Sequence, residues 1–104
     1  MIYNLNSNIF IPGKMPEFYE IVTIELLPLY PRLGLKMAGS FHAYTGNMNS
    51  GFALYVFDDL ASFQKSREAQ QKDGDFQKVM AKLNVSLISQ TFTLLEPNPW
   101  SPMK

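Results

Sequence analysis

Cysteine is absent from the sequence. A chain without thiols forms no disulfide bonds, offers no thiolate nucleophile and cannot build a cysteine-ligated zinc site. Histidine is almost absent too, since His42 is the single imidazole. Any metal would depend on carboxylates, which fall mostly in predicted helices and loops, so we expect neither a metal site nor a cofactor.

A surplus of charge is also lacking, because nine Lys and Arg residues balance nine Asp and Glu residues without forming a basic cluster. Binding to nucleic acid or to an anionic membrane normally needs such a cluster. No segment approaches the roughly 20 apolar residues of a membrane span, and the opening MIYNLNSNIF lacks the features of a secretory signal. We expect a soluble cytoplasmic protein that binds neither nucleic acid nor membrane, and an uncharged partner fits this balance best.

Apolar residues, by contrast, are plentiful. They make up 46% of the 104 residues, against 17% for charged residues, which is the composition of a globular protein. A chain of this length can bury a core as one domain. We therefore expect residues 1–104 to form a single domain.

Hydrophobic periodicity divides the chain into strands and helices. Alternation of apolar and polar residues predicts a strand, and a spacing of three to four residues predicts a helix. Pro16 suits the first turn of the first helix, and Asp58 is the expected N-cap of the second. The pattern predicts strands at 2–11, 36–45, 52–57 and 87–95, and helices at 16–33, 59–72 and 76–83.

The predicted order of elements is strand, helix, strand, strand, helix, strand. This order is typical of the ferredoxin-like split βαβ fold of the α+β class, in which helices cover one face of a four-stranded antiparallel sheet. The other face is then bare, yet every residue from Phe52 to Phe57 is apolar. We expect a second copy of the chain to cover that face and form a homodimer.

Polar side chains alternate along three of the predicted strands. If these rows share one face, they enclose a polar, partly wet space there. We expect a pocket on the bare face, lined by Asn6, His42, Tyr55 and Thr91, with Met37 and Phe41 pointing toward the helices. The three rows are Asn4, Asn6 and Asn8; Ser40, His42 and Tyr44; and Ser89, Thr91 and Thr93.

His42 is the candidate catalytic residue, because histidine titrates near neutral pH and can act as a general acid or base. The alternative is an ordinary strand histidine, since no acidic residue stands at an obvious paired position to orient it. Seven other residues are candidates for ligand binding: Asn4, Asn6, Ser40, Tyr44, Tyr55, Arg67 and Thr91. Their alternative role is to satisfy one another and trapped water, or, for Arg67, to form a surface ion pair.

Short motifs along the chain, in this order and spacing, resemble the NIPSNAP family: MIYNL, PGKMPEF, LLPLYPRLGLK, GNMNSGFALYVFDDLASF, SREA, DGDFQKVM and LLEPNPWSP. The resemblance implies a dimeric α+β barrel, in which two ferredoxin-like sheets close face to face. It also implies an aromatic residue at the position of Tyr55 and an arginine at that of Arg67. The family lacks an agreed reaction, so the resemblance implies no catalytic residues.

Two functional hypotheses follow. The first is a homodimeric domain that binds a small, largely apolar organic molecule in a barrel cavity. The second is a cofactor-independent enzyme, similar to the monooxygenases, isomerases and cyclases built on related barrels, acting on an aromatic or polyketide-like substrate. A structural or interaction module is a third reading, because fold does not fix function.

Overall fold

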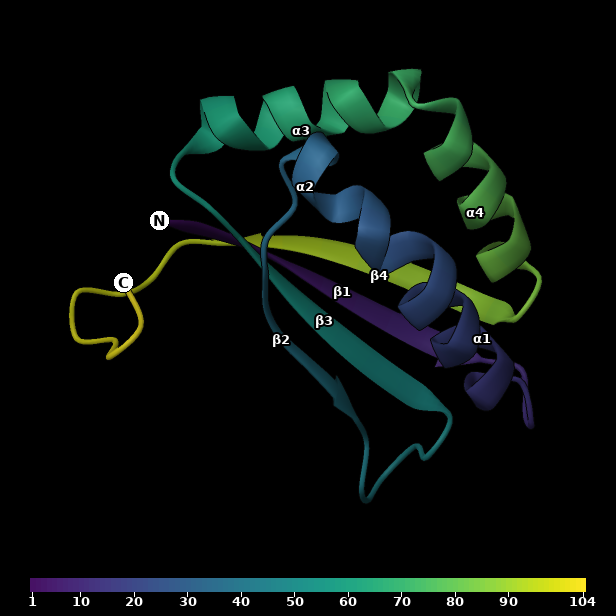
Figure 1. The fold of residues 1–104 in the computed structure, drawn as a ribbon. Helices are drawn as coiled ribbons and strands as arrows, with labels where there is room; N and C mark the ends of the chain where they lie inside the picture. The colour runs from purple at the N-terminus through teal and green to yellow at the C-terminus, as the bar shows by residue number, and fades with distance from the viewer.

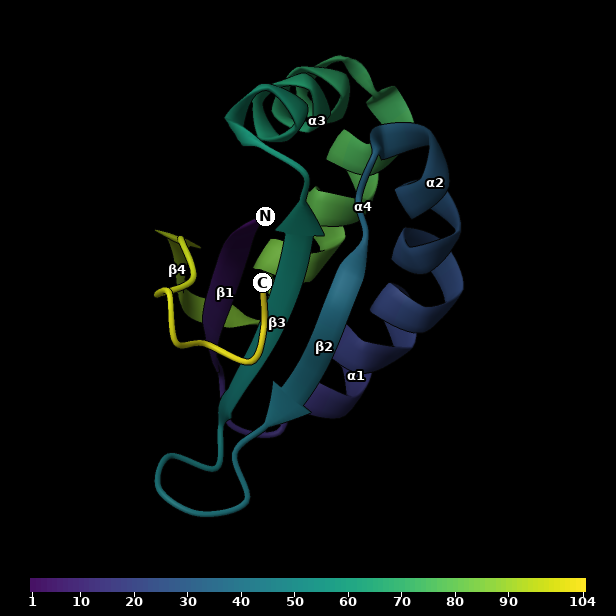
Figure 2. The same ribbon diagram turned by 90° about the vertical axis from the view of Figure 1, so that its left-hand side faces the viewer.

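The computed structural model describes residues 1–104. Four strands, β1 (Ile2–Phe10), β2 (Met37–His42), β3 (Ser50–Phe57) and β4 (Leu87–Leu95), form one sheet in the order β2-β3-β1-β4. All neighbouring strands pair antiparallel. Helices cover one face of this sheet (Figures 1 and 2). The predicted ferredoxin-like α+β fold is confirmed.

The first helical run consists of α1 (Met15–Ile21), a π-helical segment η1 (Val22–Leu26), a 3-10 turn η2 (Leu27–Leu29) and α2 (Tyr30–Leu33). Proline has no N–H, so Pro28 and Pro31 each remove a helical hydrogen bond and change the local pitch. The run ends at Gly34, which has a φ of 68°. Glycine adopts this left-handed conformation without the steric penalty of a side chain.

Two aspartates define the second helical run, α3 (Leu60–Lys72) and α4 (Gly74–Asn84). The Asp59 carboxylate accepts a hydrogen bond from the Ser62 N–H at 2.8 Å, so the predicted cap at Asp58 is wrong by one residue. An N-cap must be extended and stand three residues before the N–H that it accepts from, and Asp59 meets both conditions. Asp73 separates the two helices and caps α4 through the Phe76 N–H at 2.9 Å.

The core lies between the sheet and the helices. Its buried members come from every layer: Phe10, Phe18, Leu26, Tyr30, Tyr55, Phe57, Val79 and Leu83. Aromatic rings meet edge to face within it, as between Phe10 and Phe18, whose centroids are 4.8 Å apart. No helix combines the length and the apolar character needed to cross a bilayer.

Strand pairing fixes which side chains face the helices. Asn4 lies opposite Tyr55, Asn6 opposite Ala53 and Asn8 opposite Gly51, and directly paired residues share a face. Because Tyr55 belongs to the core beneath the helices, the asparagine row faces the helices as well. The predicted placement of this row on the bare face is wrong.

The bare face carries the other row of β1, which includes Tyr3, Leu5 and Ile9, together with Phe52, Leu54 and Val56 of β3. The carboxyl-terminal arm folds back over one end of this face (Figure 2). Pro97 and Met103 of the arm share a shallow hollow there with Tyr3 and Leu54. The rest of the face is open in a single chain.

Candidate functional site

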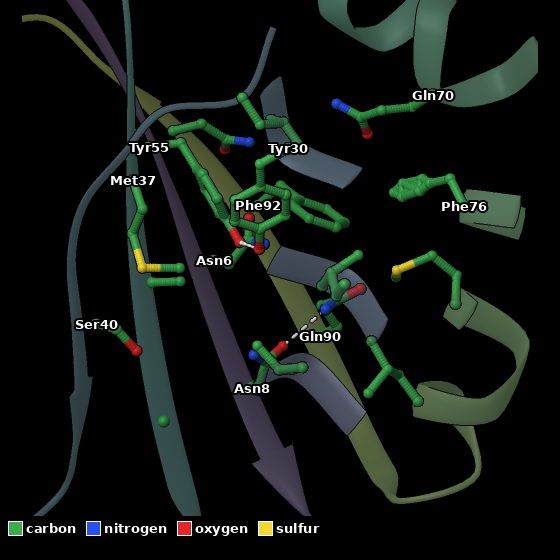
Figure 3. Close-up of a pocket in the computed structure, with 18 of the residues that line it drawn as sticks. Asn6, Asn8, Tyr30, Met37, Ser40, Tyr55, Gln70, Phe76, Gln90 and Phe92 are labelled. Carbon is green, nitrogen blue, oxygen red and sulfur yellow. Dashed lines mark hydrogen bonds between the residues drawn. The ribbon is translucent and has the colours of Figure 1, made fainter. Parts of the chain in front are cut away.

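A cavity of about 300 Å³ lies between the sheet and the helices (Figure 3). Of the 27 residues that line it, 17 are hydrophobic, so an apolar molecule fits its walls best. The apolar lining includes Phe18, Val22 and Leu26 from the first helical run, Phe76, Met80 and Leu83 from α4, and Met37 and Phe92 from the sheet.

Asparagines of β1 supply polar groups to the sheet side of the cavity. The Asn8 amide oxygen accepts a hydrogen bond from the Gln90 amide nitrogen at 2.8 Å (Figure 3). The Oδ1 atoms of Asn4 and Asn6 are buried and accept no hydrogen bond from the chain. Leaving a buried acceptor unpaired costs about 1–3 kcal/mol, so a bound molecule that donated a hydrogen bond to an amide turned toward the cavity would relieve that cost.

Two phenols meet in the cavity wall. The hydroxyl oxygens of Tyr30 on α2 and Tyr55 on β3 are 2.6 Å apart (Figure 3). Burial, together with the neighbouring phenol, raises the pKa of Tyr30, and burial raises the pKa of Tyr55, so both remain protonated at neutral pH. One hydroxyl donates to the other, which leaves one O–H of the pair free to donate to a ligand.

Groups that exchange protons near neutral pH are missing from the lining. No Asp, Glu, His or Lys side chain is among the residues around the cavity. Burial raises the pKa of the third lining tyrosine, Tyr19. The cavity can therefore donate and accept hydrogen bonds, but it offers no general acid or base that works at neutral pH.

Arg67 of α3 is the one charged residue that lines the cavity. Its guanidinium carbon lies 6.0 Å from the centre of the Phe92 ring, a cation–π contact that joins α3 to β4. Both side chains are exposed, so they mark a mouth of the cavity.

Five of the predicted ligand-binding residues lie around this one cavity: Asn4, Asn6, Ser40, Tyr55 and Arg67. The structure brings them together beneath the helices, on the face opposite to the one predicted. Strand alternation sorts residues into two rows, but it does not say which row the helices cover. The apolar row of β1 lies on the bare face, and the amide row faces the helices.

Three predicted site residues lie elsewhere. His42 pairs with Gly51 at the end of the edge strand β2, where it is exposed and does not line the cavity. Tyr44 follows that strand and is 90% exposed. Thr91 pairs with Ser7, which places it on the bare face behind the cavity.

A β-bulge in β2 explains why the predicted face is correct for Met37 and wrong for Phe41. The pairing register shifts between Met37 and Gly39, so Met37 and Ser40 face the same side although they are three positions apart in the sequence. Met37 points toward the helices as predicted, whereas Phe41, opposite Phe52, lies on the bare face. The prediction for Phe41 is wrong for this reason.

Sequence reasoning missed several lining residues, among them Tyr30, Gln70, Phe76, Gln77, Met80 and Gln90. Tyr30 and Met80 fall within the predicted helices 16–33 and 76–83, where apolar spacing indicates a buried side chain but does not separate a cavity wall from a filled core. Gln90 carried a usable signal, because it interrupts the otherwise apolar row of Ile88, Phe92 and Leu94 on β4. No group of three or more potential metal-ligating side chains occurs in the structure.

A single antiparallel sheet with helices on one face, and a cavity between the two layers, defines a ferredoxin-like α+β domain. Within that class the chain belongs to the NIPSNAP family, whose model matches residues 3–102. The resemblance predicted from the sequence motifs is thereby confirmed. No curated protein matches the chain.

Solved structures support the same fold. An uncharacterized NIPSNAP domain protein from Burkholderia xenovorans has a TM-score of 0.90 at 24% identity, covering 98% of this chain and 99% of that chain. A NIPSNAP family protein from Agrobacterium tumefaciens str. C58 has a TM-score of 0.91 at 20% identity, covering 99% and 98%. An antibiotic biosynthesis monooxygenase has a TM-score of 0.72 at 13% identity, covering 95% of this chain and 100% of that chain. At these identities the likeness shows the fold alone.

Proposed function

We propose that this protein binds a small, largely apolar organic molecule in the cavity between its sheet and helices. The observation that carries the proposal is an apolar cavity of about 300 Å³ whose wall contains two buried amide oxygens without a partner. Small-molecule sites typically occupy about 300–1,000 Å³ and combine apolar walls with a few polar groups that fix orientation. The asparagines and the tyrosine pair supply those groups here.

Binding accounts for the lining better than catalysis does. A cofactor-independent enzyme that moves a proton needs a group poised near the working pH, and the lining offers only protonated phenols and a guanidinium. His42, the candidate general acid or base, lies outside the cavity. The similarity to a monooxygenase concerns the fold and does not supply a catalytic group.

We include in the proposal that the protein acts as a cytoplasmic homodimer. The bare sheet face supports the dimer, because it exposes Phe41, Phe52 and Ile9 on one surface. A second copy that packed its own sheet against this face would remove these side chains from water. The cavity lies on the opposite side of the sheet and would remain available in such a dimer.

Native mass spectrometry of protein purified from its own host tests the binding proposal. Ala53 lines the cavity beside Asn6, so Ala53→Leu fills part of it, whereas His42→Ala alters an exposed residue outside it. We expect a co-purifying small molecule with the wild-type protein and with His42→Ala, and its loss from Ala53→Leu. Retention of the molecule by a folded Ala53→Leu variant would place the binding site elsewhere.

A further inference from the structure

Charge is distributed unevenly around the cavity. The lining contains one cation, Arg67, and no anion. Gln70 and Gln71 follow Arg67 by three and four residues on α3, so the three side chains share one side of that helix and all line the cavity. The deeper wall, with Asn4, Asn6 and the tyrosine pair, is polar but neutral at physiological pH.

Arg67 has no protein partner for its charge. Three other cations have one: Arg32 bonds Asp73 at 2.8 Å, Lys82 bonds Glu25 at 2.7 Å, and Lys14 lies 3.5 Å from Glu17. The remaining lysines also lack a carboxylate partner, but none of them lines the cavity. Arg67 forms neither an ion pair nor a hydrogen bond within the chain. Its guanidinium makes a cation–π contact with the Phe92 ring. Stacking on an aromatic ring orients a guanidinium while leaving its five N–H donors free.

We infer that the ligand is an amphipathic carboxylate, with its apolar body in the cavity and its carboxylate on Arg67 at the mouth. This inference rests on the proposed binding function and adds the charge of the ligand to it. A guanidinium fork matches a carboxylate with two parallel hydrogen bonds, and the contact is charge-assisted. Arg67 would repel an ammonium ligand, because both groups are positively charged. No carboxylate of the chain lines the cavity to attract such a ligand.

Three probes of equal chain length separate the contributions of charge and apolar surface: decanoate, decanol and decylamine. Isothermal titration calorimetry at low salt measures their dissociation constants for the wild-type protein, Arg67→Met and the control Lys65→Met. Methionine keeps an unbranched apolar stem next to Phe92 and removes the charge together with the N–H donors of the guanidinium. Lys65 lies on the same helix but does not line the cavity.

We expect decanoate to bind the wild-type protein at least about tenfold more tightly than decanol, which corresponds to about 1.4 kcal/mol. Decylamine should bind most weakly. Arg67→Met should remove the preference for decanoate while leaving decanol binding unchanged, and Lys65→Met should keep the preference. Raising the ionic strength should weaken decanoate binding and leave decanol unaffected, because salt screens the exposed charge.

Equal affinities for decanoate and decanol, or a preference that survives Arg67→Met, would overturn the inference and leave the proposed apolar site standing. Failure of all three probes to bind would contradict the proposed function itself. Arg67→Gln provides a second uncharged variant, so a folding defect in one substitution does not decide the result.

Discussion

At the scale of single residues, buried polar side chains have two separate structural roles in this protein. Some line the cavity, and Asn4 and Asn6 keep amide oxygens there without a protein partner. Others join helices to one another. Ser66 is only 3% exposed, and its hydroxyl donates to the Leu33 carbonyl at 2.7 Å and accepts from the Gln70 amide nitrogen at 3.1 Å. The hydroxyl therefore connects the end of α2 to α3.

We predict that Ser66→Ala lowers the free energy of unfolding by about 1–3 kcal/mol, because it leaves the Leu33 carbonyl without this donor in a buried place. Urea denaturation should show a lower midpoint with an unchanged slope. Gln64→Ala on the exposed side of the same helix is the control and should change stability by less than about 0.5 kcal/mol. Equal midpoints for Ser66→Ala and the wild type would contradict the structural role of this hydroxyl.

At the scale of elements, periodicity in the sequence was sufficient for the fold, and the last strand was predicted with its exact observed bounds, Leu87–Leu95. It was insufficient for the site. Asn4, Asn6 and Asn8 alternate with Tyr3, Leu5 and Ile9, and either row could face the helices if a partner covers the other. Gly39 stands at the bulge in β2, and a glycine inside a strand often marks a bulge, but it does not show that the register shifts. The bulge places Met37 and Phe41 on opposite faces, whereas simple alternation places them on the same face.

An ion-pair network of Arg32, Asp73 and Asp75 joins the two helical runs. Arg32 at the end of the first run donates two hydrogen bonds to Asp73, each 2.8 Å long, and a third to Asp75 at 3.0 Å. Asp73 also caps α4. The hydrogen bonds from Arg32, and then the one from the Phe76 N–H, hold the pKa of the Asp73 carboxyl below its ordinary value.

We predict that Asp73→Asn lowers the melting temperature at neutral pH. Asparagine is as good an N-cap as aspartate, so the substitution mainly removes one negative charge from the ion-pair network with Arg32. A carboxyl with a lowered pKa in the folded state stabilises the protein above its unfolded pKa of about 3.9, and this contribution is lost as the pH falls through the lower folded value.

Melting curves from pH 7 down to about pH 2 should therefore show wild type and Asp73→Asn converging below about pH 4. Asp58→Asn is the control, because Asp58 is exposed and forms no hydrogen bond or ion pair. A constant difference between wild type and Asp73→Asn across the whole range would rule out the charge of Asp73 as its cause.

At the scale of the whole molecule, the two faces of the sheet have different surroundings. The face beneath the helices holds the cavity, and the opposite face exposes apolar side chains in a single chain. This arrangement explains why every residue from Phe52 to Phe57 is apolar, since both faces of β3 carry apolar side chains. Ala53, Tyr55 and Phe57 face the helices, while Phe52, Leu54 and Val56 lie on the bare face.

We predict that the bare face mediates dimerisation, so that sedimentation equilibrium at micromolar concentration gives twice the chain mass of 11.9 kDa. Phe41→Asp, which puts a charge on this face, should weaken the dimer at least about tenfold. Ile24→Asp is a matched control, because Ile24 is 64% exposed on the helical side and Phe41 is 61% exposed. A monomeric wild-type protein, or equal effects of the two substitutions, would refute this prediction.

The most direct test of the central claim, a ligand site between the sheet and the helices, is an NMR titration with decanol that follows isotope-labelled methionine methyl groups. Met37 of β2 and Met80 of α4 line the cavity, whereas Met48 lies in the β2–β3 loop and Met103 in the arm over the bare face. We predict saturable shifts of the Met37 and Met80 signals, with Met48 and Met103 unchanged. Shifts confined to Met103, or no saturable shift at Met37 and Met80, would contradict the account.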